Sequence, residues 1–160
     1  MGKPAARVGD MTAHGSPLSG GIGCPTVLIG GKPAWRGMSA AAAAQLAVTV
    51  AQVGADIAKA AAKAAAASGT LAGPALQLKL AETAVSGVAK VARAMATLGG
   101  DMHACPLVKV VIPDGPGLVS VCSQTVLIGG QGAARVGDPI QEATNVNTVA
   151  AGEFTVLIGG

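Results

Sequence analysis

The sequence contains one hexapeptide three times, Thr-Val-Leu-Ile-Gly-Gly, and this repeat decides the fold. The copies lie at Thr26–Gly31, Thr125–Gly130 and Thr155–Gly160. Each copy is an apolar, β-branched run that ends in a glycine pair, a pattern typical of a short strand followed by a tight turn. Three identical segments in a chain of 160 residues indicate an internal repeat rather than a bias of composition.

A second repeated segment follows the hexapeptide. It reads Gly-Lys-Pro-Ala-Ala-Arg-Val-Gly-Asp at Gly2–Asp10 and Gly-Gln-Gly-Ala-Ala-Arg-Val-Gly-Asp at Gly130–Asp138. A third copy begins at Gly31–Gly37, breaks off, and resumes at Asp101. We therefore interpret residues 38–100 as an insertion inside the second repeat.

The first repeat is divided between the two ends of the chain, because its second segment opens the sequence and a hexapeptide closes it. Joining the ends completes three repeats, so we expect the termini to meet and the repeats to form a closed ring without exposed strand edges. The predicted fold class is mainly β. Residues 1–37 and 101–160 are expected to form a small pseudo-threefold β cone or prism, and residues 38–100 an inserted antiparallel α-helical hairpin.

The insertion has the composition of two helices. Alanine, leucine, glutamine and lysine dominate residues 39–67 and 75–98, and a helix-breaking cluster, Ser68–Pro74, separates them. The longest apolar run, residues 38–55, contains glutamine and threonine and falls short of the roughly 20 clean residues of a membrane-spanning helix. We therefore expect a soluble protein.

Composition and charge exclude several classes of function. Aromatic residues make up 1% of the chain and the net charge is +3 without a Lys/Arg cluster, so we expect no nucleic-acid partner. The first residues lack an apolar segment of signal-peptide length, so export by that route is not expected. The three cysteines are an odd number, which favours free thiols or metal ligands over a disulfide framework.

The repeat register brings together a set of possible metal ligands. Four residues after the aspartate that ends each second segment come His14, Cys105 and Glu142 in turn. Equivalent positions can converge under threefold pseudosymmetry, and His103 is close enough in the sequence to Cys105 to supply a fourth ligand. Nitrogen, sulfur and carboxylate donors suit a structural zinc ion. Glu142 is the weakest member, because a carboxylate there could equally be a solvated loop charge, and His/Cys sets also occur without a metal.

The sequence contains no catalytic constellation: it has no nucleophile elbow, no HExxH motif and no phosphate-binding loop. His14 or His103 could act as a general base beside a repeat aspartate. A zinc site with four protein ligands, however, leaves no open position for a substrate. We therefore expect that the protein is not an enzyme, the alternative being a metal-dependent enzyme with an open coordination position.

Pro4-Ala5-Ala6-Arg7 resembles the signature of the PAAR-repeat family. The segments Pro33–Arg36 and Gly132–Arg135 are similar to degenerate copies of it, and the resemblance covers residues 1–37 and 101–160. It implies a small β cone on the tip of a trimeric VgrG-type spike, in a type VI secretion system or a related contractile injection system. It also implies a zinc ion near the apex held by His and Cys residues. The last repeat of the family commonly has Cys where this chain has Glu142, a departure from the pattern.

The resemblance further implies a structural protein that caps and sharpens the spike, helps puncture target membranes in transient contact with them, and carries effectors. Such a protein resides in the bacterial cytoplasm before firing and is then secreted on the spike tip. Many members carry a C-terminal toxin domain, whereas this sequence ends inside a repeat, so no fused cargo is expected. The helical insertion could dock an effector or chaperone, or it could act on membranes directly.

Overall fold

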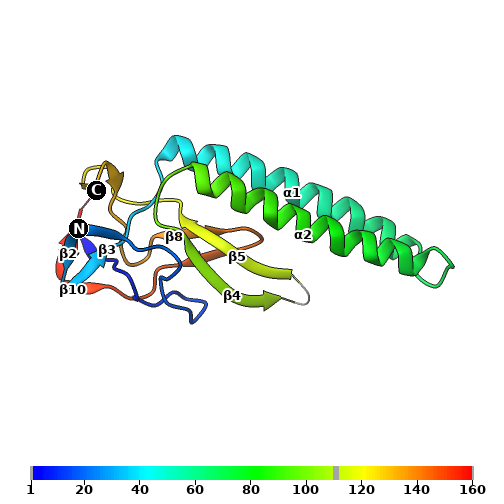
Figure 1. The fold of residues 1–160 in the computed structure, drawn as a ribbon, viewed down its shortest axis with the longest axis horizontal. Coiled ribbons are helices and arrows are strands. Elements are labelled where there is room, and N and C mark those ends of the chain that lie inside the picture. Colours follow the sequence, from blue (N-terminus) through cyan, green and yellow to red (C-terminus); the bar gives the residue numbers. More distant parts are fainter. Residues whose placement is uncertain (1, 110–111, 160) are drawn as a thin grey trace.

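The computed structural model describes residues 2–109 and 112–159, and it combines two long helices with several small sheets (Figure 1). Helix α1 spans Ala40–Ala66 and helix α2 spans Gly73–Thr97. The strands are β1 Lys3–Ala5, β2 Cys24–Ile29, β3 Lys32–Ala34, β4 His103–Lys109, β5 Ile112–Val119, β6 Leu127–Ile128, β7 Gln131–Gly132, β8 Pro139–Glu142, β9 Val146–Thr148 and β10 Glu153–Ile158. They form one four-stranded and three two-stranded sheets.

The predicted fold class is wrong. About 34% of the chain is helical and about 32% is in strands, so the class is mixed rather than a mainly β cone or prism. The physical reason is the size of the inserted helices compared with the repeats. Helix α1 has 27 residues and α2 has 25, whereas most repeat strands have only two to six.

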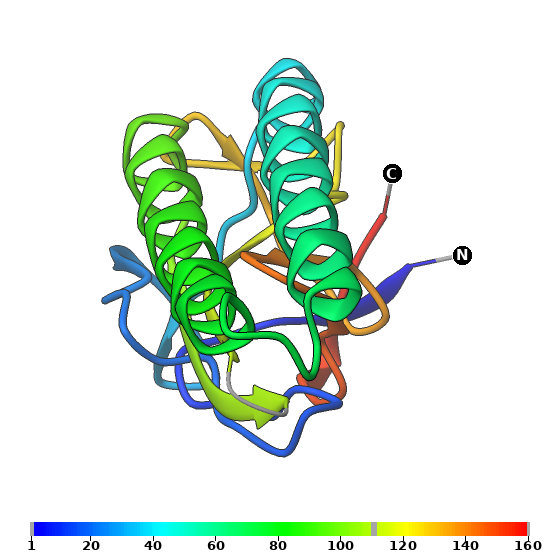
Figure 2. The same cartoon turned by 90° about the vertical axis from the view of Figure 1, so that its right-hand side faces the viewer.

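The two helices form the expected antiparallel hairpin, which projects from one end of the β-structured part (Figures 1 and 2). The side chain of Ser39 caps α1 by accepting a hydrogen bond of 3.2 Å from the backbone N–H of Ala42. A proline lies in the first turn of α2, where its missing N–H costs nothing. Close approach of the helices depends on Gly87, because a Cβ there would lie 2.5 Å from Val53 Cγ1.

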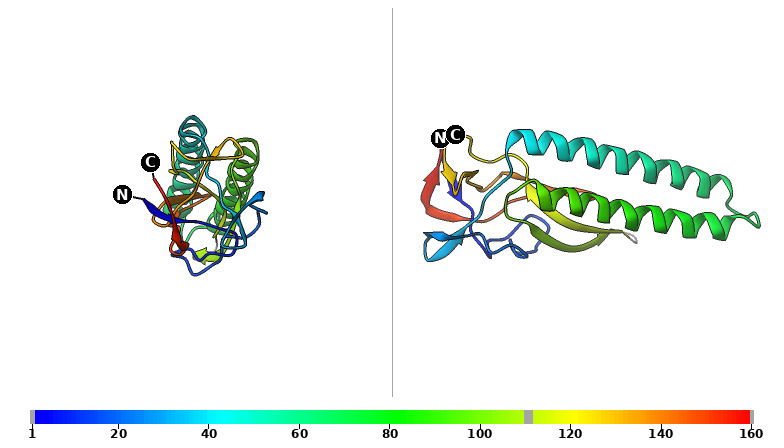
Figure 3. Two further views of the ribbon diagram at one scale, coloured as in Figure 1. Left: turned by 90° about the vertical axis from the view of Figure 1, so that its left-hand side faces the viewer. Right: turned by 45° about the horizontal axis from the view of Figure 1, so that its top comes forward.

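One end of the hairpin is anchored in a hydrophobic core with the four-stranded sheet. Met38, just before α1, and Leu46, in its first half, pack with Met95 from the end of α2, and Leu118 of β5 belongs to the same buried cluster. This contact fixes the near end of the hairpin. The far end extends well past the strands (Figure 3).

The second segments of the three repeats are hydrogen bonded in a cycle. Trp35 N donates to Ala6 O, Ala6 N to Ala134 O, and Ala134 N to Trp35 O, at 2.9, 2.9 and 3.0 Å. A second cycle runs through the neighbouring residues, from Val8 N to Pro33 O, Gly37 N to Gly132 O, and Val136 N to Pro4 O. Each segment donates to both neighbours and accepts from both, so buried backbone groups are paired without a free strand edge.

The arginine of each second segment pairs with the repeat aspartate. Arg7 binds Asp10, Arg135 binds Asp138 and Arg36 binds Asp101, each through two side-chain hydrogen bonds of 2.8–3.2 Å. The backbone N–H of each arginine donates to the same carboxylate. Arg36 and Asp101 have this geometry although 65 positions separate them in the sequence. These bidentate pairs brace equivalent turns.

The expectation that the termini meet is confirmed. Strand β1 pairs antiparallel with β10, with Lys3 opposite Ile158 and Pro4 opposite Leu157.

Candidate metal centre

A buried group of ligand-type side chains lies beside the four-stranded sheet, whose strand order is β4-β5-β8-β9. It contains His14, Cys105, Asp114 and Glu142, and one ligand atom from each lies within 4.8 Å of the others. The last three are buried, and the side chain of His14 is 16% exposed. This group could hold a metal ion.

The four residues come from four different segments. Cys105 lies on β4, Asp114 on β5 and Glu142 at the end of β8, and adjacent strands bring them together. His14 belongs to a loop held against β9, because its backbone N–H donates to the Asn147 side chain at 3.1 Å. The group therefore forms only in the folded chain, since His14 is 91 positions from Cys105 and 133 positions from Asn147 in the sequence.

The ring nitrogen Nδ1 of His14 is central to the group. It lies 3.2 Å from Glu142 Oε2, 3.4 Å from Asp114 Oδ2 and 3.7 Å from Cys105 Sγ. A cation placed among these atoms would be bound by one nitrogen, one sulfur and two carboxylate oxygens. Zinc accepts all three of these donor types.

The two carboxylates are oriented for a cation. Asn147 Nδ2 donates to Glu142 Oε1 at 2.8 Å, and Thr144 Oγ1 donates to Asp114 Oδ1 at 3.2 Å. The other oxygens, Glu142 Oε2 and Asp114 Oδ2, are buried and accept no hydrogen bond from the part of the chain that the structure describes, although both lie near His14 Nδ1. Buried carboxylate oxygens need a partner. A metal ion would satisfy both at once, so the residues fit one.

The electrostatics of the metal-free group point the same way. Burial raises the pKa of the Cys105 thiol above its usual range, and the neighbouring Glu142 carboxylate adds to the effect. Concentrating anionic ligands in a buried place is unfavourable on its own. A bound divalent cation reverses this balance and favours the thiolate.

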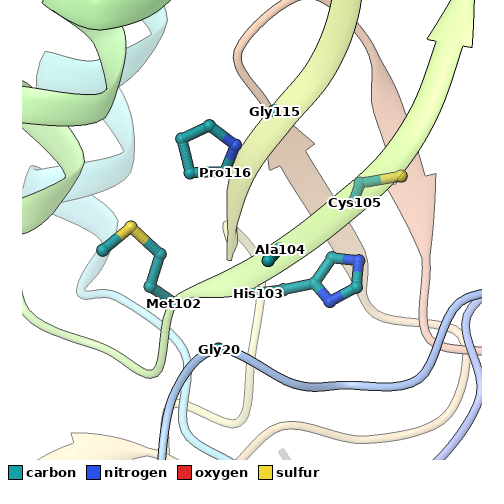
Figure 4. A pocket seen from close by; sticks show the side chains of 7 residues that line it. All are labelled: Gly20, Met102, His103, Ala104, Cys105, Gly115 and Pro116. Carbon is teal, nitrogen blue, oxygen red and sulfur yellow. The ribbon is translucent and has the colours of Figure 1, made fainter.

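His103, a predicted ligand, lies outside the group. It is 1% exposed, and its Nε2 lies 3.3 Å from Ser16 Oγ and 3.9 Å from Glu142 Oε1. Its side chain and that of Cys105 lie on the same side of β4, away from Met102 (Figure 4). Residues two apart on a strand are nearly 7 Å apart, however, so Cys105 reaches the centre and His103 stands beside it. Burial lowers the pKa of His103, and the charge of His14 contributes.

Asp114 is the member that the sequence analysis missed. It lies in Pro113-Asp114-Gly115-Pro116, which is typical of a turn, and it has no counterpart in the repeat register. In the structure this segment is part of β5, with Gly117 opposite both His103 and Glu142. Only the pairing of β5 between β4 and β8 brings Asp114 to the centre.

A hollow of about 410 Å³ lies next to this group, lined by Gly20, Met102, His103, Ala104, Cys105, Gly115 and Pro116 (Figure 4). Its lining is mostly apolar, and the side chains of His103 and Cys105 point away from Met102, which lies on the helix side of β4. Apart from Cys105, which belongs to the group, His103 is the one residue of this lining with a nitrogen ligand atom.

Comparisons of the chain with family models, curated proteins and solved structures found no match.

Proposed function

We propose that the group binds a structural zinc ion. His14, Cys105, Asp114 and Glu142 would hold it, and a mixed nitrogen, sulfur and oxygen set suits a borderline cation better than a hard one such as magnesium. The ion would supply a cross-link between the His14 loop and the strands β4, β5 and β8. Four protein ligands would occupy all positions of a tetrahedral site, so we propose a structural role rather than catalysis.

We further propose that the protein is the tip of a secretion spike and docks on the blunt end of a trimeric VgrG-type protein. The observation that carries this proposal is the exposure of the three repeated hexapeptides. Their leucines, Leu28, Leu127 and Leu157, are 60, 61 and 62% exposed. Large apolar side chains exposed to the same extent by three repeats of one chain suit a partner that offers one site three times.

The exposed leucines supply enough apolar area to matter. A fully buried leucine contributes roughly 1.5–3 kcal/mol, so covering the exposed part of each would contribute about 1–2 kcal/mol. Two valines of the same segments, Val126 and Val156, are each 37% exposed and enlarge the surface. Strands β2 and β10 lie at the end of the molecule opposite the tip of the helical hairpin (Figure 1). Docking at that end would leave the hairpin free.

In this proposal the protein stays in the bacterial cytoplasm until firing and is then secreted on the spike, in transient contact with the target membrane. The zinc ion would stiffen a body whose core contains few large side chains. We call the exposed side chains of Leu28, Leu127 and Leu157 the leucine surface. Axial force would pass from the spike through this surface into the hydrogen-bonded repeats.

The test is binding to the trimeric spike protein of the same organism. We expect the wild-type chain to co-purify with the trimer, and we expect the variant L28D/L127D/L157D to lose this binding. The matched control is V48D/L78D/V85D, whose three side chains are 59, 63 and 69% exposed on the hairpin, and it should still bind. Equal retention of both triple variants would refute docking through the hexapeptides.

A second candidate function, action on membranes, is favoured by α1. This helix of 27 residues is long and apolar enough to cross a bilayer by length and composition alone, and little of it is buried. It is longer than the apolar run considered from the sequence, because the helix continues through Asp56, Lys59 and Lys63. Leakage of dye from liposomes by the wild-type chain, abolished by removal of residues 40–97, would support this function.

A further inference from the structure

The net positive charge of the protein lies entirely on the helical hairpin. Of the 11 basic and 8 acidic residues of the chain, five and two lie within residues 40–97, which leaves six of each for the rest. The hairpin therefore carries the whole net charge of +3. Its far half extends past the strands and is covered by no other element among residues 2–109 and 112–159 (Figures 1 and 3).

A groove of about 230 Å³ runs between the helices in this far half. Its lining residues from the two helices are Asp56, Lys59, Ala60, Lys63, Leu76, Lys79 and Thr83. Ala60, Leu76 and Thr83 are half-buried and form the floor, whereas the charged residues are exposed. The rim thus has three cations against one anion, with lysines contributed by both helices.

The groove is the solvent-facing edge of the contact between the helices. That contact is built by buried residues, including Val53, Ala64, Ala84, Gly87 and Val91. The floor residues Ala60, Leu76 and Thr83 lie on the same side of their helices by spacing, but they are only half-buried. The ion pair between Lys79 and Glu82, at 3.6 Å, is exposed on both sides and contributes little. The lysine rim is therefore available to an incoming group.

We propose that this groove docks an amphipathic α-helix of a partner protein, with small apolar side chains along one stripe and carboxylates on both sides of it. The lining residues span 56–63 and 76–83, which is about 12 Å, or two helical turns, on each helix. A partner helix laid on the groove would complete a three-helix bundle. Its stripe would cover Ala60 and Leu76, and its carboxylates would face lysines on both rims.

An anionic bilayer would also attract the lysines, but it fits the groove less well. A headgroup surface presents charge without an apolar ridge narrow enough to reach a floor that lies between two helices. The helix proposal also stands apart from the zinc ion and from spike docking. It can fail while both of those proposals hold, and the reverse is also true.

The test uses the full chain and two synthetic helical peptides of three heptads, with alanine and leucine at the a and d positions. One has glutamate and the other lysine at the e and g positions. We expect the glutamate peptide to bind the wild-type chain about tenfold more tightly than the lysine peptide, and this difference to shrink at high salt. In K59E/K63E the preference should reverse.

The matched control is K90E/R93E, which makes the same change of charge on the hairpin outside the groove. It should keep the preference for the glutamate peptide to within about twofold. Circular dichroism verifies that each variant keeps its helices. Equal effects of the two double variants, or equal binding of the two peptides, would overturn the proposal. Binding to vesicles of phosphatidylglycerol but to neither peptide would overturn it in favour of a membrane.

Discussion

Replacing Asp114 with Asn tests the metal centre, because the variant should change stability in opposite directions with and without metal. Asp114 Oδ2 and Glu142 Oε2 are buried within 4.8 Å of each other. At an effective dielectric constant of about 20, two ionised carboxylates at that distance repel each other by about 3.5 kcal/mol. His14 Nδ1 lies 3.4 Å from Asp114 Oδ2 and 3.2 Å from Glu142 Oε2, and a proton on that nitrogen would offset part of this repulsion. We therefore expect Asp114→Asn to stabilise the metal-free protein by about 1–3 kcal/mol.

With zinc bound, the sign reverses. A metal present at a thousand times its dissociation constant stabilises the folded state by about 4 kcal/mol. Asparagine lacks the charge of the ligand, and a hundredfold loss of affinity would remove about 2.7 kcal/mol of that stabilisation. Since 1 kcal/mol corresponds to about 2–4 °C for a chain of this size, the two shifts of the melting temperature are measurable.

The assay is thermal unfolding followed by circular dichroism, once in EDTA and once with excess zinc. Asp114→Asn should melt above the wild type in EDTA and below it in zinc. The control, Asp56→Asn on the exposed surface of α1, should differ little from the wild type in either buffer. A shift of the same sign in both buffers would refute the metal centre and leave Asp114 with its hydrogen bond from Thr144 and its contact with His14.

Two further predictions concern packing and pH. A Cβ at Gly117 would lie 2.8 Å from Ile140 Cγ2 and 2.9 Å from Glu142 Cγ. Gly117→Ala should therefore lower the free energy of unfolding by about 1–3 kcal/mol and weaken zinc binding. Thermal unfolding and zinc titration measure the two effects. Gly54→Ala, in open space on α1, should instead stabilise by up to about 1 kcal/mol, and a loss there would contradict the reasoning. Burial raises the pKa of Cys122 above its usual value of 9.0, with Asp138 adding to the effect. This difference stabilises the folded protein at every pH below the pKa of the unfolded thiol. The stabilisation is lost as the pH rises through the raised pKa of the folded thiol, because the unfolded thiol gives up its proton first. In a Cys105→Ser background in EDTA, Cys122→Ala should make the fall of the melting temperature with rising pH less steep. An unchanged slope would contradict this prediction.

The repeats made much of the fold predictable. Identical hexapeptides and the repeated Arg-to-Asp spacing require equivalent local structures, so the pairing of Arg36 with Asp101 could be anticipated across the insertion. The meeting of β1 and β10 follows from the same counting, because half a repeat stands at each end. The fold class was not predictable by this route. Repeats indicate how segments relate to one another, not what share of the chain they occupy.

The candidate metal centre shows which ligands the repeat register can predict and which it cannot. His14, Cys105 and Glu142 occupy equivalent positions in the repeats, and the structure brings these three together. Asp114 lies outside the register, and its place depends on the pairing of β5 with two strands distant in the sequence. His103 was expected as a fourth ligand because it is close to Cys105 in the sequence. On a strand that closeness places two side chains side by side along one face rather than at one point.

The insertion is compatible with the hydrogen-bonded repeats because its two ends meet. A Cβ at Gly100 would lie 3.2 Å from the carbonyl carbon of Gly37, and Gly100 has a φ of +92°, so this approach requires glycine. Asp101 N donates to Arg36 O at 3.0 Å, which joins the chain directly across the base of the hairpin. The helices therefore leave and return at nearly one point. Their closure adds little strain to the repeats, and the surface of the hairpin can change without altering the metal centre or the leucine surface.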